Sequence, residues 1–429
     1  MRTSSSCSGR AMARVAAGFF FALLPLLAQL PVKLVIPDSI GVNIHFTNPA
    51  AGEAKMLADA GFKWIRMDFG WGSTEREKGV YDFSRYDQLN AALHPYGIRG
   101  IFILDYSNRL YDEGLSPYTE EGRHAFAQWS AAAVRHFKGQ GILWEMYNEP
   151  NIGFWKPKPN AHDYALLALA VGKALREAEP GEIYIGPATS RVDLPFIEES
   201  FRVGMLEYWS AVSVHPYRLT PPENTTEDYA ALRALIAKYA PGKSIPIISG
   251  EWGYSALPGQ HAPWKVLDED SQGKYVAREF LGNIANGVPL SIWYDWHDDG
   301  APVAAGQRDD SEHHFGVVKF AYYAGRDPVY DPKPGFTATK TLTTVLNGFT
   351  FEKRLDAGKP DDYVLVFRKG KQIGVAAWTL SADPHHAQVP VERGRYKAVS
   401  YLGKDLGSLT AGGKGLDLDL SDGPQYLVK

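Results

Sequence analysis

Short apolar runs alternate with helical patterns along most of this 429-residue chain, which predicts a (β/α)8 TIM barrel in residues 36–348. Residues 349–429 instead alternate apolar and polar residues between glycine-rich turns, which predicts a small C-terminal β-sandwich domain. The length fits both parts, because a barrel of this kind needs about 250 residues. The predicted class is therefore α/β.

Eight runs have the length and composition of buried parallel strands. They are Ile40–Phe46, Lys63–Phe69, Ile98–Leu104, Ile142–Tyr147, Ile183–Gly186, Val212–Tyr217, Ile245–Ser249 and Val288–Tyr294. Helical spacing lies between and after them, at Gly52–Ala60, Ser84–Tyr96, Glu120–Lys138, His162–Ala178, Thr226–Tyr239, Ser271–Asn286 and Thr337–Leu346. The antiparallel strands predicted in the last domain are Asp362–Arg368, Lys371–Leu380, Arg395–Leu402 and Gly415–Leu420.

The segment Asp295–Phe336 follows the eighth predicted strand and is unusually long for a connection. Long connections inside compact domains often serve as lids or binding loops. We therefore expect this segment to form a wall of a substrate cleft.

The first 35 residues are predicted to be a targeting segment and not part of the fold. Arg2, Arg10 and Arg14 precede the apolar stretch Val15–Leu30, an arrangement typical of a secretory signal peptide. No clear small-residue cleavage site follows, so an uncleaved membrane anchor is the alternative, although a spanning helix needs about 20 residues. The protein is expected to be secreted or periplasmic, or attached to a membrane through this segment alone.

Composition excludes several classes of function. The net charge is −4 and there is no cluster of Lys and Arg to bind phosphates, so nucleic acid is not an expected partner. No phosphate-binding or dinucleotide motif is present, and His pairs such as His313–His314 lack the spacing of zinc ligands. We expect no cofactor and no metal. Aromatic residues reach 13%, and flat amphipathic rings suit the faces of sugars.

Two of the predicted strands end in a glutamate. The run Ile142–Asn151 (ILWEMYNEPN) brings Glu149 to the end of strand four, and Ser244–Gly253 (SIPIISGEWG) brings Glu251 to the end of strand seven. A single carboxylate there could simply favour the start of a helix. A pair is more informative, because strand ends of a closed barrel face one another across its mouth. Two carboxyl groups are the minimum equipment for cleaving a glycosidic bond.

The motifs around these strand ends resemble those of the clan A glycoside hydrolases. The resemblance lies in NEP after strand four, HPY within Val214–Tyr217, GEW at strand seven and the Trp-rich strand eight, and it covers nearly the whole barrel. The stretches WIRMDFGW, GVYDFSRYDQL, FILDYSN and EHHFG are most similar to glycoside hydrolase family 39, with family 5 a near second. The resemblance implies a retaining glycosidase whose two carboxylates lie on strands four and seven.

The resemblance also implies a role for each residue of the pair and for its neighbour. Glu149 corresponds to the general acid/base, whose pKa we expect burial and the neighbouring carboxylate to raise. Glu251 corresponds to the nucleophile, and the two carboxyl groups of a retaining enzyme lie about 5 to 5.5 Å apart. Asn148 corresponds to the residue that binds the sugar 2-hydroxyl group.

Four further residues correspond to substrate-site positions of the clan. Arg66 and Tyr217 match the residues that hydrogen-bond the nucleophile, His215 matches the histidine of strand six, and Trp293 matches the aromatic floor under the sugar. Three of these four residues have a simpler alternative. Arg66 also fits an ion pair inside the barrel, and His215 and Trp293 also fit ordinary core positions.

The predicted function is cleavage of a β-linked oligo- or polysaccharide by double displacement, in a monomeric protein. One alternative is a barrel that binds polysaccharide without cleaving it. Another is a transglycosylase, in which a second sugar and not water intercepts the intermediate at the same site. Sugar identity and linkage depend on loop shapes that the sequence does not define.

Overall fold

The barrel is the central feature of the fold. The computed structural model describes residues 30, 34–257, 268–301, 303, 307 and 309–429, so the predicted targeting segment lies almost wholly outside the described residues. Within them, eight parallel strands close a barrel in the order β1-β10-β9-β8-β7-β6-β5-β2. Their bounds are β1 Ile40–Asn43, β2 Trp64–Gly70, β5 Arg99–Asp105, β6 Leu143–Met146, β7 Ile183–Ser190, β8 Ala211–His215, β9 Ile247–Trp252 and β10 Ser291–Trp293. The predicted (β/α)8 barrel is confirmed.

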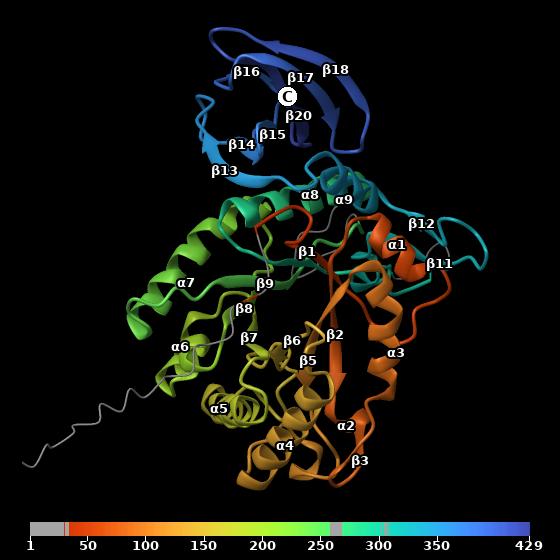
Figure 1. Ribbon diagram of the computed structural model, residues 1–429, viewed down its shortest axis with the longest axis vertical. Helices are drawn as coiled ribbons and strands as arrows, with labels where there is room; N and C mark the ends of the chain where they lie inside the picture. Colours follow the sequence, from red (N-terminus) through yellow and green to blue (C-terminus); the bar gives the residue numbers. More distant parts are fainter. Residues whose placement is uncertain (1–29, 31–33, 258–267, 302, 304–306, 308) are drawn as a thin grey trace, which may run out of the picture.

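Helices surround the barrel (Figure 1). The main ones are α1 Glu53–Asp59, α3 Ser84–Leu93, α4 Glu120–His136, α5 Ala161–Ala178, α6 Leu194–Arg202, α7 Thr225–Tyr239, α8 Glu269–Ala285 and α9 Pro334–Val345. The shorter elements are α2 Trp71–Thr74, the hairpin of β3 Glu75–Glu77 and β4 Val80–Tyr81, and 3-10 turns at His94–Tyr96, Asp112–Gly114, Met205–Glu207 and Pro222–Asn224. No helix in the described part of the chain is long and apolar enough to cross a membrane.

Polar residues before several helices fix where these helices begin. The side chains of Thr119, Asn160, Asp193 and Asp268 each accept a hydrogen bond from a main-chain N–H of the following first turn. Such caps satisfy donors that have no partner within the helix. Asp193 starts α6, a helix that the sequence analysis did not predict.

The interior of the barrel changes from apolar to charged along its axis. Near the amino ends of the strands it is filled by Trp64, Ile101, Leu143, Ile183, Ile185, Ala211, Ile248, Leu290 and Ile292. Farther along, the fully buried Arg66 and Glu145 form an ion pair with Nε and Oε2 2.5 Å apart. Buried charges cost free energy unless each is well paired, so this layer indicates a function at the carboxyl ends of the strands.

Residues 295–336 do not form the single long loop that was predicted. They contain the 3-10 turn η5 (Ser311–His314), an antiparallel hairpin of β11 (Val318–Tyr322) and β12 (Tyr330–Pro332), and the start of α9. In β11 the outward positions Phe320 and Tyr322 are aromatic and exposed. Because these exposed positions are aromatic and not polar, the sequence of β11 does not show the alternation of polar and apolar residues by which a strand is predicted.

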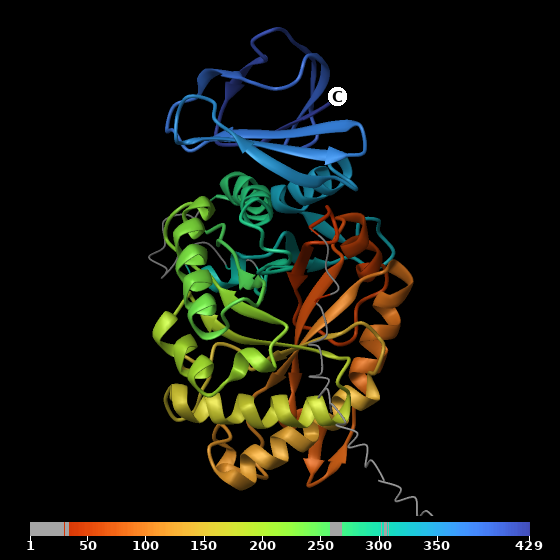
Figure 2. The same ribbon diagram turned by 60° about the vertical axis from the view of Figure 1, so that its left-hand side comes forward.

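The C-terminal residues form a β-sandwich, as predicted. Its strands are β13 Thr350–Leu355, β14 Asp362–Lys369, β15 Gln372–Thr379, β16 His385–Val389, β17 Gly394–Ser400, β18 Asp405–Ala411, β19 Leu416–Leu420 and β20 Gln425–Val428. Among the described residues, the larger sheet has the order β13-β14-β15-β20-β17-β18, and β16 pairs with β19. Figures 1 and 2 show this domain stacked on α8 and α9, at one side of the barrel.

Candidate active site

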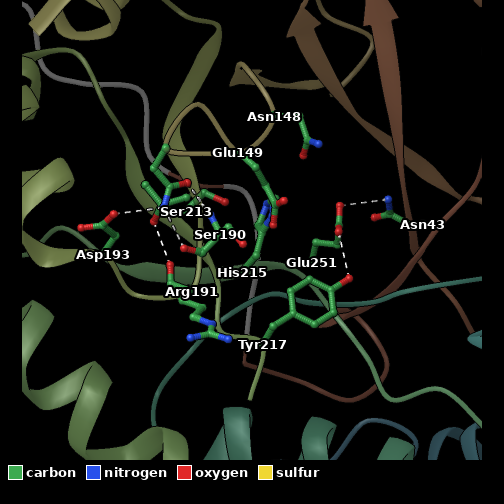
Figure 3. A network of polar contacts seen from close by, with 12 residues as sticks. Asn43, Asn148, Glu149, Ser190, Arg191, Asp193, Ser213, His215, Tyr217 and Glu251 are labelled. Atoms are coloured by element: carbon green, nitrogen blue, oxygen red, sulfur yellow. Dashed lines mark hydrogen bonds and ion pairs between the residues drawn. The ribbon is translucent and has the colours of Figure 1, made fainter. Parts of the chain in front are cut away.

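A cavity of about 920 Å³ opens at the carboxyl ends of the barrel strands. Its lining includes residues at or just beyond the ends of most strands, among them Asn43, Arg66, Asp68, Tyr106, Asn148, Glu149, Ser190, Tyr217, Glu251 and Tyr294. A volume of this size is typical of a binding site for a small-molecule ligand. Figure 3 shows Glu149 and Glu251 facing each other within this group.

Glu149 lies in a strained turn directly after β6. Tyr147 and Glu149 have φ values of 62° and 43°, a left-handed conformation that costs side-chain-bearing residues about 1 kcal/mol or more each. The Glu149 N–H donates to the carbonyl of Ala188 at the end of β7, 3.0 Å away, which holds the turn. Burial raises the pKa of Glu149 to about 7, although a hydrogen bond from Ser190 and the charge of Arg66 lower it. The predicted direction is correct, and burial, not the neighbouring carboxylate, is the main cause.

His215 lies behind Glu149 and has a defined proton position. Arg66 Nη2 can only donate, and it lies 3.1 Å from His215 Nε2, so this ring nitrogen must be the acceptor. The proton is then on Nδ1, which donates to Glu149 Oε1 at 3.0 Å. Burial and the charge of Arg66 lower the pKa of His215 to about 4, so the ring is neutral near pH 7.

Glu251 is the last residue but one of β9 and is surrounded by donors. Arg66 Nη1 lies 2.5 Å from Oε2, Tyr217 Oη donates to Oε1 at 2.9 Å, and Asn43 Nδ2 donates to Oε2 at 3.4 Å. Donors of this kind stabilise the ionised carboxylate. Glu251 is 8% exposed, and its position on the cavity wall leaves it open to a ligand.

Arg66 connects the residues of the site. Its guanidinium donates to Glu145, Glu251 and, from Nη2 at 2.9 Å, to Asn148 Oδ1. Burial alone would lower the pKa of Arg66, but the charges of Glu145 and Glu251 outweigh it and raise the pKa. Asn148 uses its oxygen for Arg66 and hydrogen-bonds the Tyr106 hydroxyl group through its amide, so one amide N–H remains for a ligand in the cavity.

The carboxyl groups of Glu149 and Glu251 lie close together. An oxygen of Glu149, an oxygen of Glu251 and a ring nitrogen of His215 all lie within 4.8 Å of one another. Closure of the barrel therefore brings two carboxyl groups that are distant in sequence to within reach of one ligand atom.

The structure brings together most, but not all, of the predicted site residues. Glu149, Glu251, Asn148, Arg66 and Tyr217 line the cavity. His215 is fully buried and contacts the site only through Glu149 and Arg66, so it is not placed to touch a substrate.

Trp293 is not at the position that was predicted for it. Its ring is fully buried and Nε1 donates to the carbonyl of Phe315 at 3.1 Å, so it cannot form the floor under a sugar. The next residue, Tyr294, lines the cavity instead. Successive side chains of a strand point to opposite sides, so an error of one residue exchanges the core and the cavity.

Several lining residues were not predicted as site residues. Asn43 and Tyr106 stand at the ends of β1 and β5, where strand-end position was a usable signal. Ser190 and Arg191 gave no signal, because the strand was predicted to end at Gly186 and β7 continues to Ser190. Glu312, in η5, lines the cavity, so the segment expected to wall a cleft does contribute to it.

Two groups of described residues hold three possible metal ligands each. They are Glu149, His215 and Glu251, and at the edge of the cavity His45, Asp295 and Asp299. In the first group the neighbouring Arg66 cation already pairs with Glu251, which opposes binding of a second cation. The expectation that no metal takes part stays a prediction.

Comparison with known proteins defines the family. A family model described as cellulase, glycosyl hydrolase family 5, matches residues 36–299. The chain belongs to this family. A search of curated proteins gives no match.

Solved structures share the fold of this family 5 chain. A family 39 glycoside hydrolase from the gut symbiont Bacteroides cellulosilyticus WH2 matches with a TM-score of 0.75 and 23% identity, over 92% of this chain and 81% of that one. A monomeric β-xylosidase from Caulobacter crescentus CB15 matches with a TM-score of 0.65 and 17% identity, over 94% of this chain and 97% of that one. A family 30 endoxylanase from Clostridium papyrosolvens C71 matches with a TM-score of 0.63 and 9% identity, over 94% of this chain and 98% of that one. The predicted resemblance to clan A is confirmed, and the protein is a glycosidase.

Proposed function

We propose that the protein is a retaining glycosidase in which Glu149 is the general acid/base and Glu251 the nucleophile. The observation that carries this proposal is the approach of their carboxyl oxygens to within 4.8 Å across the cavity. An inverting enzyme needs room for a water molecule between its carboxyl groups, which then lie about 6.5 to 9.5 Å apart. The shorter distance suits direct attack of a carboxylate on the sugar.

In the first step, the Glu149 carboxylic acid gives its proton to the glycosidic oxygen as that bond breaks. Glu251 attacks the anomeric carbon and forms a covalent glycosyl-enzyme. The environments suit these roles. Burial raises the pKa of Glu149 to about 7, which favours its protonated form below that pH, while Arg66 and Tyr217 donate to Glu251. The alcohol then leaves with the proton from Glu149.

In the second step, Glu149 is a carboxylate and takes a proton from the attacking water. Water bonds to the anomeric carbon, the bond to Glu251 breaks, and Glu149 regains its proton. His215 Nδ1–H supports the charged form of Glu149 in this interval, because it donates to Oε1. The second amide N–H of Asn148, beside the one that meets Tyr106, can donate to the sugar 2-hydroxyl group, a contact that strengthens as positive charge builds on the ring.

The test compares two variants with an activated aryl glycoside and azide. Glu251→Ala should lose turnover by at least about 10⁴-fold, and azide should restore it with a product of inverted configuration. Glu149→Ala should keep formation of the glycosyl-enzyme, and azide should give a product of retained configuration. Glu312→Gln, a cavity carboxyl outside the pair, is the control. Full activity of Glu251→Ala would remove the proposal.

The proposed substrate is a β-linked oligo- or polysaccharide. The similar structures include a β-xylosidase and an endoxylanase, so xylan and xylo-oligosaccharides belong in the first panel of substrates. Analysis of products at high acceptor concentration separates hydrolysis from transglycosylation, because only transfer yields longer oligosaccharides. Calorimetry alongside a product assay tests the non-catalytic alternative, which predicts binding without cleavage.

We also propose that the protein is exported and acts as a monomer. Export is supported by the three arginines that precede the apolar stretch Val15–Leu30. The monomeric state is supported by the similar β-xylosidase that is described as monomeric. Fractionation of cells and light scattering of the purified protein test these two proposals.

A further inference from the structure

The turn at the end of β7 forms one wall of the cavity and is strained. Ser190, Arg191 and Asp193 all line the cavity. Arg191 has a φ of 60°, and Ala188, three residues earlier, has a φ of 55°. A residue with a side chain is disfavoured in this left-handed region, and such strain tends to persist where a function requires it.

This turn is held in place by hydrogen bonds from two neighbouring strand ends. The Asn151 amide donates from Nδ2 to the Ser190 carbonyl and accepts from the Ser190 N–H, both at 2.9 Å. Asn151 also donates to the Asp193 carboxylate at 3.1 Å. The Arg191 N–H donates to the carbonyl of His215 at 2.7 Å. The main chain of Arg191 is therefore fixed relative to Glu149, which precedes Asn151 by two residues (Figure 3).

The guanidinium of Arg191 has no acidic partner among the residues that the structure describes. Arg191 is an exposed residue that lines the cavity, and Figure 3 draws dashed lines to its main chain but none to its guanidinium group. Arg66, the other arginine of the cavity, is fully buried and neutralised by Glu145 and Glu251. A strained and firmly held turn thus carries a cation that forms no ion pair with the described part of the chain.

We propose that Arg191 binds an anionic group of the substrate, so that the enzyme acts on an acidic glycan carrying carboxylate or sulfate groups. This inference rests on the proposed function of the same cavity. A planar guanidinium matches both anions, because two of its N–H groups can donate to two oxygens at once. Glycine would adopt this turn without strain. An arginine here therefore costs free energy, which indicates that its side chain has a function.

Within the described residues, the acidic groups nearest this turn form no ion pair with Arg191. Asp193 keeps its negative charge, but its oxygens accept from Asn151 and from the N–H of Phe196 at the start of α6. Burial raises the pKa of Glu312 to about 7, so this cavity carboxyl is mostly uncharged at pH 6. The test is therefore best done at pH 6 and low ionic strength, where screening is weak.

The first measurement is binding, and it does not depend on turnover. Glucuronate, glucose 6-sulfate and glucose are titrated into the wild-type protein, Arg191→Gly and Arg191→Gln. The wild type should bind at least one of the two anionic sugars 10- to 100-fold more tightly than glucose, as a charged hydrogen bond provides. Comparing the two anionic sugars separates carboxylate from sulfate. Both variants should remove the preference, and Arg191→Gly should fold at least as well as the wild type, because a φ of 60° suits glycine.

Arg395→Gln is the matched control, since Arg395 is also an exposed arginine but lies on β17 in the β-sandwich. It should leave the preference for anionic sugars intact. Equal binding of all three sugars to the wild type, or a preference that survives in Arg191→Gly, would overturn the inference. A wild type that binds anionic sugars through Arg191 but cleaves no glycoside would overturn the proposed function and leave standing only the binding of an anionic sugar by Arg191.

Discussion

Glu149 and Glu251 have almost the same exposure, 6% and 8%, so burial alone does not give them different roles. Their partners differ. Glu251 accepts from the Arg66 cation, while Glu149 accepts from His215, a ring that is neutral at pH 7. The Arg66 cation stabilises negative charge on Glu251, whereas a neutral donor opposes protonation of the buried Glu149 less strongly.

Replacing Ser190 should change the pH dependence of activity. The Ser190 hydroxyl group lowers the pKa of Glu149 against the effect of burial, so Ser190→Ala should raise this pKa. The alkaline limb of kcat/KM should move to higher pH by about half a unit to one unit, the equivalent of one neutral hydrogen bond. Ser190→Thr, which keeps the hydroxyl group, should restore the wild-type limb. An unchanged limb in Ser190→Ala would mean that the hydroxyl group does not act on Glu149.

The buried acid should also affect stability. Its pKa is raised from 4.5 to about 7 on folding, so the folded state binds the extra proton between these values. The stability linked to this proton is complete below pH 4.5 and is lost as pH rises through about 7. Between pH 4 and 8 the wild type should lose about 3 kcal/mol relative to Glu149→Gln, by urea unfolding at each pH. Parallel pH profiles for the two proteins would contradict the raised pKa.

Site residues with a distinctive chemical group could be predicted from the sequence, whereas residues whose place depends on strand register could not. Glu149, Glu251 and Asn148 are recognisable because acidic and amide groups end otherwise apolar strands. Trp293 was expected in the site because it corresponds to the aromatic floor of the clan, but the strand turns it into the core and Tyr294 lines the cavity. Arg191 could not be predicted, since its φ of 60° depends on contacts with Asn151 and His215.

Among the elements, β9 and β10 control where Glu251 and Tyr294 stand relative to each other. Gly253 follows Glu251 by two residues, and a Cβ built on it would lie 2.1 Å from the Tyr294 carbonyl oxygen. This close approach requires glycine, because the atom that would have to move is backbone. The two strand ends are thereby kept in contact at the cavity wall.

Gly253→Ala should therefore separate the two strand ends and reduce kcat/KM by about 100-fold, as displacements near 1 Å do in active sites. The free energy of unfolding should fall by about 1 to 3 kcal/mol from the overpacking. Gly282→Ala in α8 is the control, because nothing lies within 4 Å of its built Cβ and alanine favours a helix. A Gly253→Ala enzyme with wild-type kinetics would show that the contact does not position the site.

The existence of the elements was predictable because burial on both faces of a parallel strand leaves a continuous apolar run. Their ends were less predictable. The strand predicted to stop at Gly186 continues through Pro187 to Ser190, although proline normally argues against a central strand. The bulge recorded between Pro187 and Thr189 accommodates this proline, and it arises from pairing with β8, which a local pattern cannot reveal.

On the scale of the whole molecule, the β-sandwich packs on the barrel through one face of its larger sheet. Leu365 and Phe367 of β14 belong to the core shared with the barrel, while the alternate residues Val364 and Val366 belong to the interior of the sandwich. Trp378 of β15 is fully buried on the barrel side. The predicted boundary near residue 348 falls between α9 and β13, and we propose that the two parts fold together.

A buried polar contact joins the two parts. Glu223 of the barrel accepts from Arg278 of α8 at 2.7 and 2.9 Å and from Trp378 Nε1 at 2.8 Å. Arg278 Nη1 also donates to the carbonyl of Asp422 at 3.3 Å. Hydrogen bonds that cross a buried apolar interface fix its geometry, because any other arrangement would leave a charged group without a partner.

A chain that ends at residue 348 should therefore be unstable. It would expose the apolar face under Leu365, Phe367 and Trp378 and leave the Glu223–Arg278 pair in partial contact with water. In the full-length chain, Trp378→Ala should lower the free energy of unfolding by about 3 to 5 kcal/mol, whereas Trp378→Phe should cost less because it keeps most of the apolar contact. Trp378 does not line the cavity, so kcat/KM of the folded fraction should stay near that of the wild type for both variants. Size-exclusion chromatography and thermal unfolding test both expectations, and a shortened chain that is monomeric, soluble and fully active would show that the barrel folds without its partner.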